Sequence, residues 1–243
     1  MTKLRFTNIT KSFGITHVLE NISFIVQEGE FVSILGPSGS GKSTIFRLIG
    51  GIIVPDDGEI LIDDENIIGK RGSISFMPQT PSLFPWRTVL ENVLLGQEIM
   101  GKRDIQIART MLERAGLSEY ENASPYELSG GMQQRVSFIR SLLSPQSIIC
   151  LDEPFSALDE FTRLDMQKWL QSMWLENKRT ILFVTHNIEE AIFLSDRIIV
   201  LSEKPAKVKK EFVIPFEHPR SEELFLTKEF LDWKKIIFEE MKR

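Results

Sequence analysis

The feature that most constrains this chain is a glycine-rich loop, Gly36-Pro37-Ser38-Gly39-Ser40-Gly41-Lys42-Ser43-Thr44. It follows a short apolar run and opens an apolar helical pattern, which is the strand, loop, helix context of a phosphate-binding loop. Its glycines let successive backbone amides turn inward around an anion, and the start of the next helix adds to that attraction. We expect all nine residues to hold a nucleotide, with Lys42 at the β- and γ-phosphates and the Ser43 hydroxyl on Mg²⁺.

Short apolar runs recur along the chain with helical patterns between them, as expected of an α/β fold with a parallel sheet covered by helices. Each is nearly continuous in Val, Ile, Leu and Phe, which is typical of strands buried on both faces. The runs span residues 31–35, 73–77, 147–151, 180–184 and 197–201. From Leu4 to Val26 the pattern is closer to alternation, which favours antiparallel strands beside the main sheet.

Between about residues 81 and 145 the strand pattern gives way to helical spacing. One example is the set Ile105, Ala108, Met111, Leu112 and Ala115. We therefore expect a helical subdomain inserted into the α/β core, and a core domain that spans residues 1–215.

A last strand is expected near residues 208–214, followed by a C-terminal helical extension over 216–243. Its apolar stripe comprises Leu226, Phe230, Trp233, Ile237 and Met241. Such a stripe could form a dimer contact, but amphipathic helices ordinarily turn this face to their own core, which we favour here.

Two adjacent acids, Asp152 and Glu153, follow the run 147–151. Ligands of a parallel sheet bind at the carboxyl ends of its strands, so Asp152 is suited to hold Mg²⁺ directly or through water. Glu153 can take a proton from an attacking water. Solvated acids at a strand end are the alternative, and the glycine-rich loop elsewhere in the chain argues against it.

A second motif, Leu128-Ser129-Gly130-Gly131-Met132-Gln133-Gln134-Arg135, resembles the signature sequence of ABC ATPases. A serine N-cap followed by two glycines leaves helix amides free to bind a second anion. The resemblance covers roughly Leu4 to Ile214 and implies a P-loop NTPase (RecA-like) core that uses ATP and Mg²⁺. In the family, Ser129, Gly130 and Gly131 would contact the nucleotide of a second copy, which implies a head-to-tail dimer.

The remaining family elements appear in order. Phe13 stands where the family has an aromatic residue, usually Tyr, that stacks on adenine. Gln79 matches the glutamine that touches Mg²⁺ and the attacking water. Ser156-Ala157-Leu158-Asp159 matches the D-loop, and Asp159 is its aspartate. His186 matches the switch histidine that bonds the γ-phosphate. The resemblance thus implies catalysis by Lys42, Gln79, Glu153 and His186.

The segment Ser82 to Val93 looks like the part of importer ATPases of the nitrate, sulfonate, taurine and pyrimidine-precursor group that follows their glutamine. This resemblance implies transmembrane permease subunits that dock on the helical insert, and an extracytoplasmic solute-binding protein. Alternatively, Phe84 and Trp86 only pack the insert. No apolar stretch reaches the roughly 18 to 20 residues that span a bilayer. We therefore expect a cytoplasmic protein, peripheral on the inner face of the cell membrane.

Composition bears on two other classes. With 34 acidic and 29 basic side chains, the net charge of -5 offers no global positive field for nucleic acid. This argues against an ABC ATPase of translation or DNA repair, and we expect no nucleic-acid partner. A non-catalytic ATP switch is disfavoured because every expected catalytic residue is present. The single cysteine, Cys150, lies in an apolar run and is expected in the core.

Overall fold

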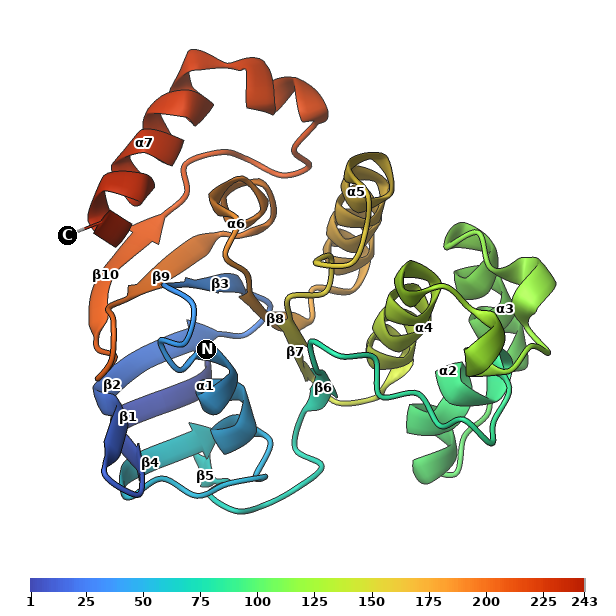
Figure 1. The fold of residues 1–243 in the computed structure, drawn as a ribbon, viewed down its shortest axis with the longest axis horizontal. Coiled ribbons are helices and arrows are strands. Elements are labelled where there is room, and N and C mark those ends of the chain that lie inside the picture. Colours follow the sequence, from blue (N-terminus) through green and yellow to red (C-terminus); the bar gives the residue numbers. More distant parts are fainter. Residues whose placement is uncertain (243) are drawn as a thin grey trace.

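The fold, a computed structural model that describes residues 1–242, is built on two sheets (Figure 1). The six-stranded sheet has the order β10-β9-β3-β8-β7-β6, with β10 antiparallel to β9 and the other pairs parallel. Its strands are β3 (Phe31–Leu35), β6 (Ser75–Met77), β7 (Ile148–Asp152), β8 (Thr180–Val184), β9 (Arg197–Leu201) and β10 (Val208–Val213). All five predicted parallel runs are confirmed as strands. The second begins two residues later than expected, at Ser75, and the third begins one residue later, at Ile148.

Alternate residues of the central strands face two separate cores. In β7, Ile149 and Leu151 pack among the helices on one side of the sheet, while Ile148 and Cys150 pack toward the antiparallel sheet and α1 (Lys42–Ile49). Strands covered on both faces have no solvent-facing residue, which explains their unbroken apolar runs. Cys150 is buried as predicted, and this burial raises the pKa of its thiol.

The second sheet is antiparallel and has the order β2-β1-β4-β5. It consists of β1 (Thr2–Phe13), β2 (Thr16–Gln27), β4 (Asp57–Ile62) and β5 (Glu65–Asn66). The hairpin between β1 and β2 turns at Gly14, whose φ of 58° suits glycine. The antiparallel segment predicted over Leu4 to Val26 is confirmed, and the turn places Phe13 at the end of β1.

Between β6 and β7 the chain forms helices only, at the right of Figure 1. They are α2 (Val89–Ile99), α3 (Ile105–Arg114), α4 (Gly130–Leu143) and the short 3₁₀ turns η1 (Ser118–Tyr120) and η2 (Pro125–Glu127). In α3, Ala108, Met111 and Leu112 are buried, whereas Ile105 is 39% exposed at the first turn. The helical spacing therefore identified the inward face correctly, except at its first residue.

Two more helices, α5 (Glu160–Asn177) and α6 (Ile188–Leu194), follow β7 and β8. The chain ends in η3 (Glu222–Leu226) and α7 (Lys228–Lys242). Phe230 and Ile237 are buried in a core shared with α6 and β9, so α7 packs on its own domain as we favoured. The stripe is wrong at Leu226, which is 86% exposed. Leu226 lies in η3, and a separate 3₁₀ turn does not continue the face of the later helix.

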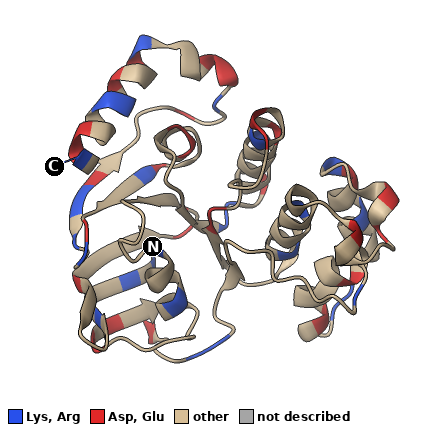
Figure 2. Ribbon diagram, in the orientation of Figure 1, with Lys and Arg blue, Asp and Glu red and all other residues tan. Residues whose placement is uncertain are grey.

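Acidic and basic side chains are mixed over the surface, in line with their similar numbers in the sequence. Lys and Arg are interspersed with Asp and Glu over the antiparallel sheet, the helical segment and α7 (Figure 2). Within residues 1–242 no helix has both the length and the hydropathy needed to cross a bilayer.

Candidate nucleotide site

The glycine-rich loop joins β3 to α1 at the carboxyl edge of the parallel sheet. Gly39 has φ +78° and Gly41 has φ +103°, a region that side-chain-bearing residues rarely adopt. A Cβ on Gly41 would also lie 2.8 Å from a Leu19 methyl carbon and 2.9 Å from a Val18 methyl carbon. The loop therefore needs glycine at position 41 both for its backbone turn and for its close approach to β2.

Lys42 holds this loop together from inside. Its ammonium donates to the carbonyl oxygens of Gly36 (2.8 Å) and Pro37 (2.9 Å). Burial lowers the pKa of Lys42, while the charges of Glu153 and Asp152 act in the opposite direction. The Ser40 hydroxyl is buried without a hydrogen-bond partner, which leaves a donor free at the loop. A cation and a free donor in one turn suit an anionic ligand.

The loop lines a cavity of about 390 Å³. Its lining comprises Phe13, Val18, Ser38, Gly39, Gly41, Lys42, Ser43, Thr44, Gln79, Glu153 and Lys204. Phe13 stands 46% exposed at the end of β1, so its ring is free to stack on a planar base. Phe13 and six of the nine predicted loop residues therefore meet in one cavity, whereas Gly36, Pro37 and Ser40 do not line it. The individual roles of these residues remain predictions.

Asp152 is the last residue of β7 and is almost fully buried. Burial raises the pKa of its carboxyl group, a hydrogen bond with Ser43 lowers it, and the neighbouring Glu153 raises it again. Ser43 and Asp152 thus lie together, as two oxygen ligands of one Mg²⁺ ion would. A divalent cation there would favour the ionised carboxylate.

Glu153 brings three predicted catalytic residues together. The Gln79 side-chain amide donates to one carboxylate oxygen over 3.1 Å, and His186 Nδ1 lies 3.3 Å from the other. Gln79 follows β6 and His186 follows β8, so the strand order β8-β7-β6 sets both side chains on either side of Glu153. Two polar groups beside a carboxylate at the edge of this cavity can orient a water for attack.

The backbone of Glu153 is held in a left-handed conformation, with φ 48°. Its amide donates to the Val184 carbonyl over 2.9 Å, and its carbonyl accepts the Ser156 hydroxyl over 3.0 Å. Strained residues persist where their surroundings over-determine them, and such positions concentrate at functional sites.

Two further residues of the site had no role in our reading of the sequence. The buried amide of Gln134, on α4, lies 3.4 Å from the carbonyl oxygens of both Gln79 and Glu153. Its position inside the signature motif, on the core-facing side of α4, was a signal for it. Lys204 lines the cavity from the loop between β9 and β10, and no sequence motif marks it.

The signature residues and the D-loop lie elsewhere. Ser129 caps α4 by accepting from the Met132 amide over 3.3 Å, and it is exposed. A Cβ on Gly131 would lie 3.4 Å from the Ala157 carbonyl, so the signature turn packs on the D-loop. Asp159 caps α5 through the Thr162 amide (3.0 Å). Neither turn lines the cavity at Lys42, so within one chain the two predicted anion sites stay apart.

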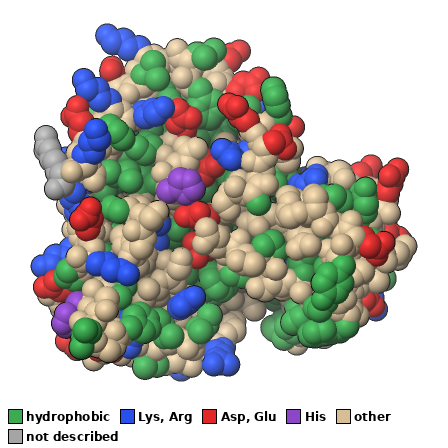
Figure 3. Space-filling model, in the orientation of Figure 1, with side chains coloured by type: hydrophobic (Ala, Val, Ile, Leu, Met, Phe, Trp, Pro, Cys, Tyr) green, Lys and Arg blue, Asp and Glu red, His purple; other side chains and the backbone are tan. Residues whose placement is uncertain are grey.

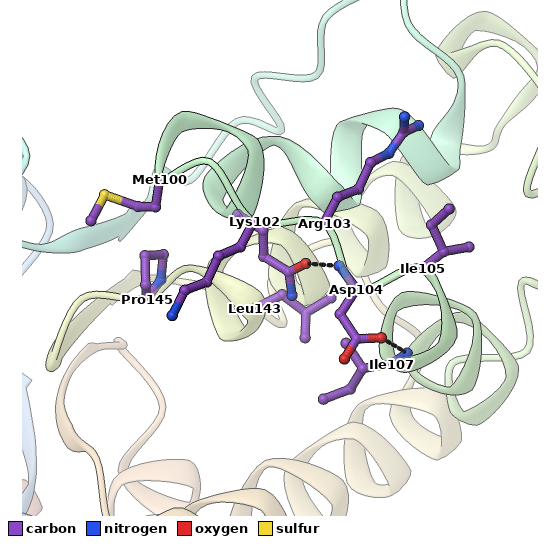
Figure 4. A pocket seen from close by; sticks show the side chains of 9 residues that line it. Met100, Lys102, Arg103, Asp104, Ile105, Ile107, Leu143 and Pro145 are labelled. Atoms are coloured by element: carbon purple, nitrogen blue, oxygen red, sulfur yellow. Dashed lines mark hydrogen bonds between the residues drawn. The ribbon is translucent and has the colours of Figure 1, made fainter.

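A larger cavity, of about 620 Å³, lies between α2, α3 and the end of α4 (Figure 4). Two of its polar side chains, Gln97 and Asp104, already serve the local fold. The Gln97 side chain accepts from the Asp104 amide over 2.7 Å, and the Asp104 carboxylate accepts from the Ile107 amide over 3.0 Å to cap α3. We therefore assign the nucleotide to the smaller cavity, where glycine turns and charged groups converge.

Comparison with known proteins agrees with this geometry. The family described as ABC transporter matches residues 19–156. An uncharacterized ABC transporter ATP-binding protein of Methanocaldococcus jannaschii is 40% identical over 247 residues, covering 99% of this chain and 91% of that protein. An aliphatic sulfonates import ATP-binding protein of Bacillus cereus is 42% identical over 212 residues, covering 87% of this chain and 84% of that protein.

Among solved structures, a dimeric ATP-binding cassette in a post-hydrolysis state, bound to ADP and Pi, superposes with a TM-score of 0.79 at 34% identity. The match covers 88% of this chain and 100% of that one. The predicted fold, a P-loop NTPase core with an antiparallel sheet and inserted helices, is confirmed by this likeness. The chain belongs to the ABC transporter family, as an ATP-binding cassette that hydrolyses ATP.

Proposed function

We propose that this cassette drives import of a small solute through separate transmembrane permease subunits, and that it belongs functionally with the sulfonate, nitrate and taurine importers. The observation that carries the proposal is the Glu153 carboxylate between Gln79 and His186 at the Lys42 cavity, because this is a site built for ATP hydrolysis. The import role rests on the similarity to the sulfonate import protein of Bacillus cereus. A sulfonate-type anion is accordingly our first candidate for the solute.

In hydrolysis, Glu153 accepts the proton of the attacking water, while Gln79 and His186 fix that water and the γ-phosphate. Lys42 leaves its loop carbonyls for the β- and γ-phosphates, and Phe13 stacks on the adenine. Mg²⁺ held by Ser43, Gln79 and Asp152 would neutralise charge on the phosphates. These side chains act chiefly by positioning and by stabilising charge.

A second copy completes the site. Ser129, Gly130 and Gly131 lie at an exposed helix start, and free amides at such a start attract an anion. In a two-fold dimer this turn of one copy would meet the γ-phosphate held by the other, with Asp159 beside the interface. The dimeric form of the similar solved cassettes supports this arrangement.

The permease would dock on the segment before α2. The Phe84 and Trp86 rings stack 5.0 Å apart, and Trp86 is 76% exposed. The buried amide of Asn92 fixes this segment, since it donates to the carbonyls of Phe84 (3.1 Å) and Arg87 (3.2 Å). Hydrophobic side chains gather over the helical segment at the lower right of Figure 3. A rigid, exposed aromatic pair is typical of an anchor in a protein interface. Docking there would hold the cassette on the inner face of the membrane, and an extracytoplasmic solute-binding protein would deliver the solute.

Glu153→Gln tests the hydrolytic assignment. The substitution keeps the size and polarity of the side chain but removes the proton acceptor, so steady-state ATP hydrolysis should fall by about 10²- to 10⁴-fold. The affinity for ATP, measured by calorimetry, should stay within about twofold, because glutamine keeps the size and polarity of the side chain at the cavity. Undiminished hydrolysis would refute the role of Glu153, and stimulation of wild-type hydrolysis by DNA or RNA would favour the nucleic-acid alternative.

Trp86→Ala tests the docking assignment. Uptake of an alkanesulfonate into cells that carry the cassette with its permease should fall, because the exposed aromatic anchor is lost, while hydrolysis by the purified cassette stays unchanged. Tyr126→Ala is the control, since Tyr126 is also exposed (82%) but lies on η2. Equal uptake by the Trp86 and Tyr126 variants would argue against the docking site.

A further inference from the structure

A set of buried polar contacts holds the backbone on either side of the switch histidine, His186. The Thr185 hydroxyl donates to a Glu190 carboxylate oxygen over 2.6 Å and accepts from the Asn187 amide over 3.0 Å. Thr185 and Asn187 are the two neighbours of His186 in the chain. Glu190 therefore fixes the backbone on both sides of the residue that contacts Glu153.

The same carboxylate faces α5. Arg163 Nε lies 3.8 Å from the second Glu190 oxygen, and another guanidinium nitrogen donates to the Leu158 carbonyl over 2.9 Å. Leu158 belongs to the D-loop, directly before Asp159. Arg163 thus joins the D-loop to Glu190, and Glu190 joins Arg163 to the switch.

Glu190 is only 7% exposed. Its burial raises the pKa of the carboxyl group, and the Thr185 hydrogen bond and the Arg163 charge lower it. Arg163 Nε is buried and has no hydrogen-bond partner, although it faces this carboxylate. The pair is therefore close but not fully bonded, so a small movement of the D-loop end of α5 would tighten or loosen it.

Both side chains also line a small cavity of about 50 Å³, which Glu153 and His186 line as well. Neither Arg163 nor Glu190 lines the cavity at Lys42. They are thus placed to act on hydrolysis through His186 rather than on nucleotide binding.

We infer that Arg163 and Glu190 are positioning residues that set His186 against Glu153 and pass the position of the D-loop to it within one chain. The inference rests on the proposed role of Glu153 and His186 in hydrolysis. It makes hydrolysis depend on the D-loop even when the residues that touch ATP are unchanged.

The test measures kcat, KM and ATP affinity for Glu190→Gln, Arg163→Met and the double variant. Glu190→Gln keeps a polar partner for Thr185 but removes the charge that faces Arg163. Each single variant should lower kcat by about 10- to 100-fold, as a misplaced catalytic group does, with ATP affinity unchanged. Because the two residues act as one unit, the double variant should be no slower than the slower single one. Arg163→Lys should recover part of the loss.

Lys168→Gln serves as the control, since Lys168 lies on the same helix and pairs with Glu222 at the surface. Its kcat should equal that of the wild type. Thermal unfolding of every variant separates positioning from folding, and Glu190→Asp provides a milder change if Glu190→Gln fails to fold. Unchanged kcat, a raised KM with unchanged kcat, or additive losses in the double variant would each overturn the inference. If the wild type failed to hydrolyse ATP, or if Glu153→Gln kept full activity, the proposed function itself would fail instead.

Discussion

At the scale of single residues, the left-handed backbone of Glu153 lowers the stability of the fold at a position that serves hydrolysis. Its φ of 48° costs about 1 kcal/mol for a side-chain-bearing residue, whereas glycine adopts it freely. Glu153→Gly should therefore be about 1 kcal/mol more stable to urea than Glu153→Ala, although neither should hydrolyse ATP. At Asp165, which is exposed within α5, the order should reverse because glycine weakens a helix. If the Gly and Ala variants had the same order of stability at both positions, the backbone of Glu153 would not be strained.

Lys204 gives a second prediction at this scale. Its loop is tied to β2 by the bond from the Ala206 amide to the Val18 carbonyl (2.9 Å), which holds the lysine at the cavity. Lys204→Ala should weaken ATP binding by roughly three- to fivefold, as loss of one exposed charge contact does, and less at high salt. Lys207→Ala is the control, because Lys207 pairs with Glu20 (3.1 Å) outside that lining. Calorimetry at two salt concentrations measures the ATP affinity of both variants. Equal losses of affinity in the two variants would exclude a specific contact between Lys204 and ATP.

At the scale of elements, Asp196 fixes the C-terminal extension to the sheet. Its carboxylate accepts from the Phe31 amide over 2.9 Å and lies 3.5 Å from His218 Nε2. Burial acts to raise the pKa of Asp196, but the neighbouring His218 and the hydrogen bond from the Phe31 amide outweigh it and hold the pKa below its ordinary 3.8. Because the folded value is depressed, this contribution to stability is full above about pH 4 and is lost as pH falls through the folded pKa.

Asp196→Asn should therefore be less stable than the wild type at pH 7, and the difference should shrink below about pH 4. Urea unfolding at a series of pH values measures it. A difference that stays constant from pH 7 to pH 3 would contradict the prediction.

Elements were predictable where local pattern decides them. The unbroken apolar runs that begin at Phe31 and Thr180 indicate strands buried on both faces. The glycines of the glycine-rich loop indicate its backbone conformation. The contacts of Arg163 with Glu190 and the position of Lys204 were not predictable, because each depends on where separate elements meet in space. Leu226 failed for a related reason, since a helical stripe shows spacing but not where the helix begins.

At the scale of the whole molecule, one chain carries one phosphate loop and one signature turn, on elements that Figure 1 shows well apart: α1 beside the antiparallel sheet and α4 in the helical segment. A two-fold dimer is the smallest closed arrangement that can bring the loop of each copy to the turn of the other. Such a dimer has two composite sites, and each needs one intact loop and one intact turn.

Mixing two inactive variants tests whether each site is shared between two copies of the chain. Lys42→Ala removes the phosphate-loop cation, and Ser129→Arg blocks the signature turn, so each alone should hydrolyse almost no ATP. A mixed dimer retains one complete site, formed by the loop of the Ser129 variant and the turn of the Lys42 variant. Random pairing makes half of the dimers mixed, so an equal mixture should recover up to about a quarter of the wild-type rate if the sites act independently. Mixing Lys42→Ala with Glu153→Gln is the control and should recover nothing, because both defects lie on the loop side of the site and no complete site can form. An inactive first mixture, with binding of ATP intact in the Ser129 variant, would mean that hydrolysis does not use a shared site.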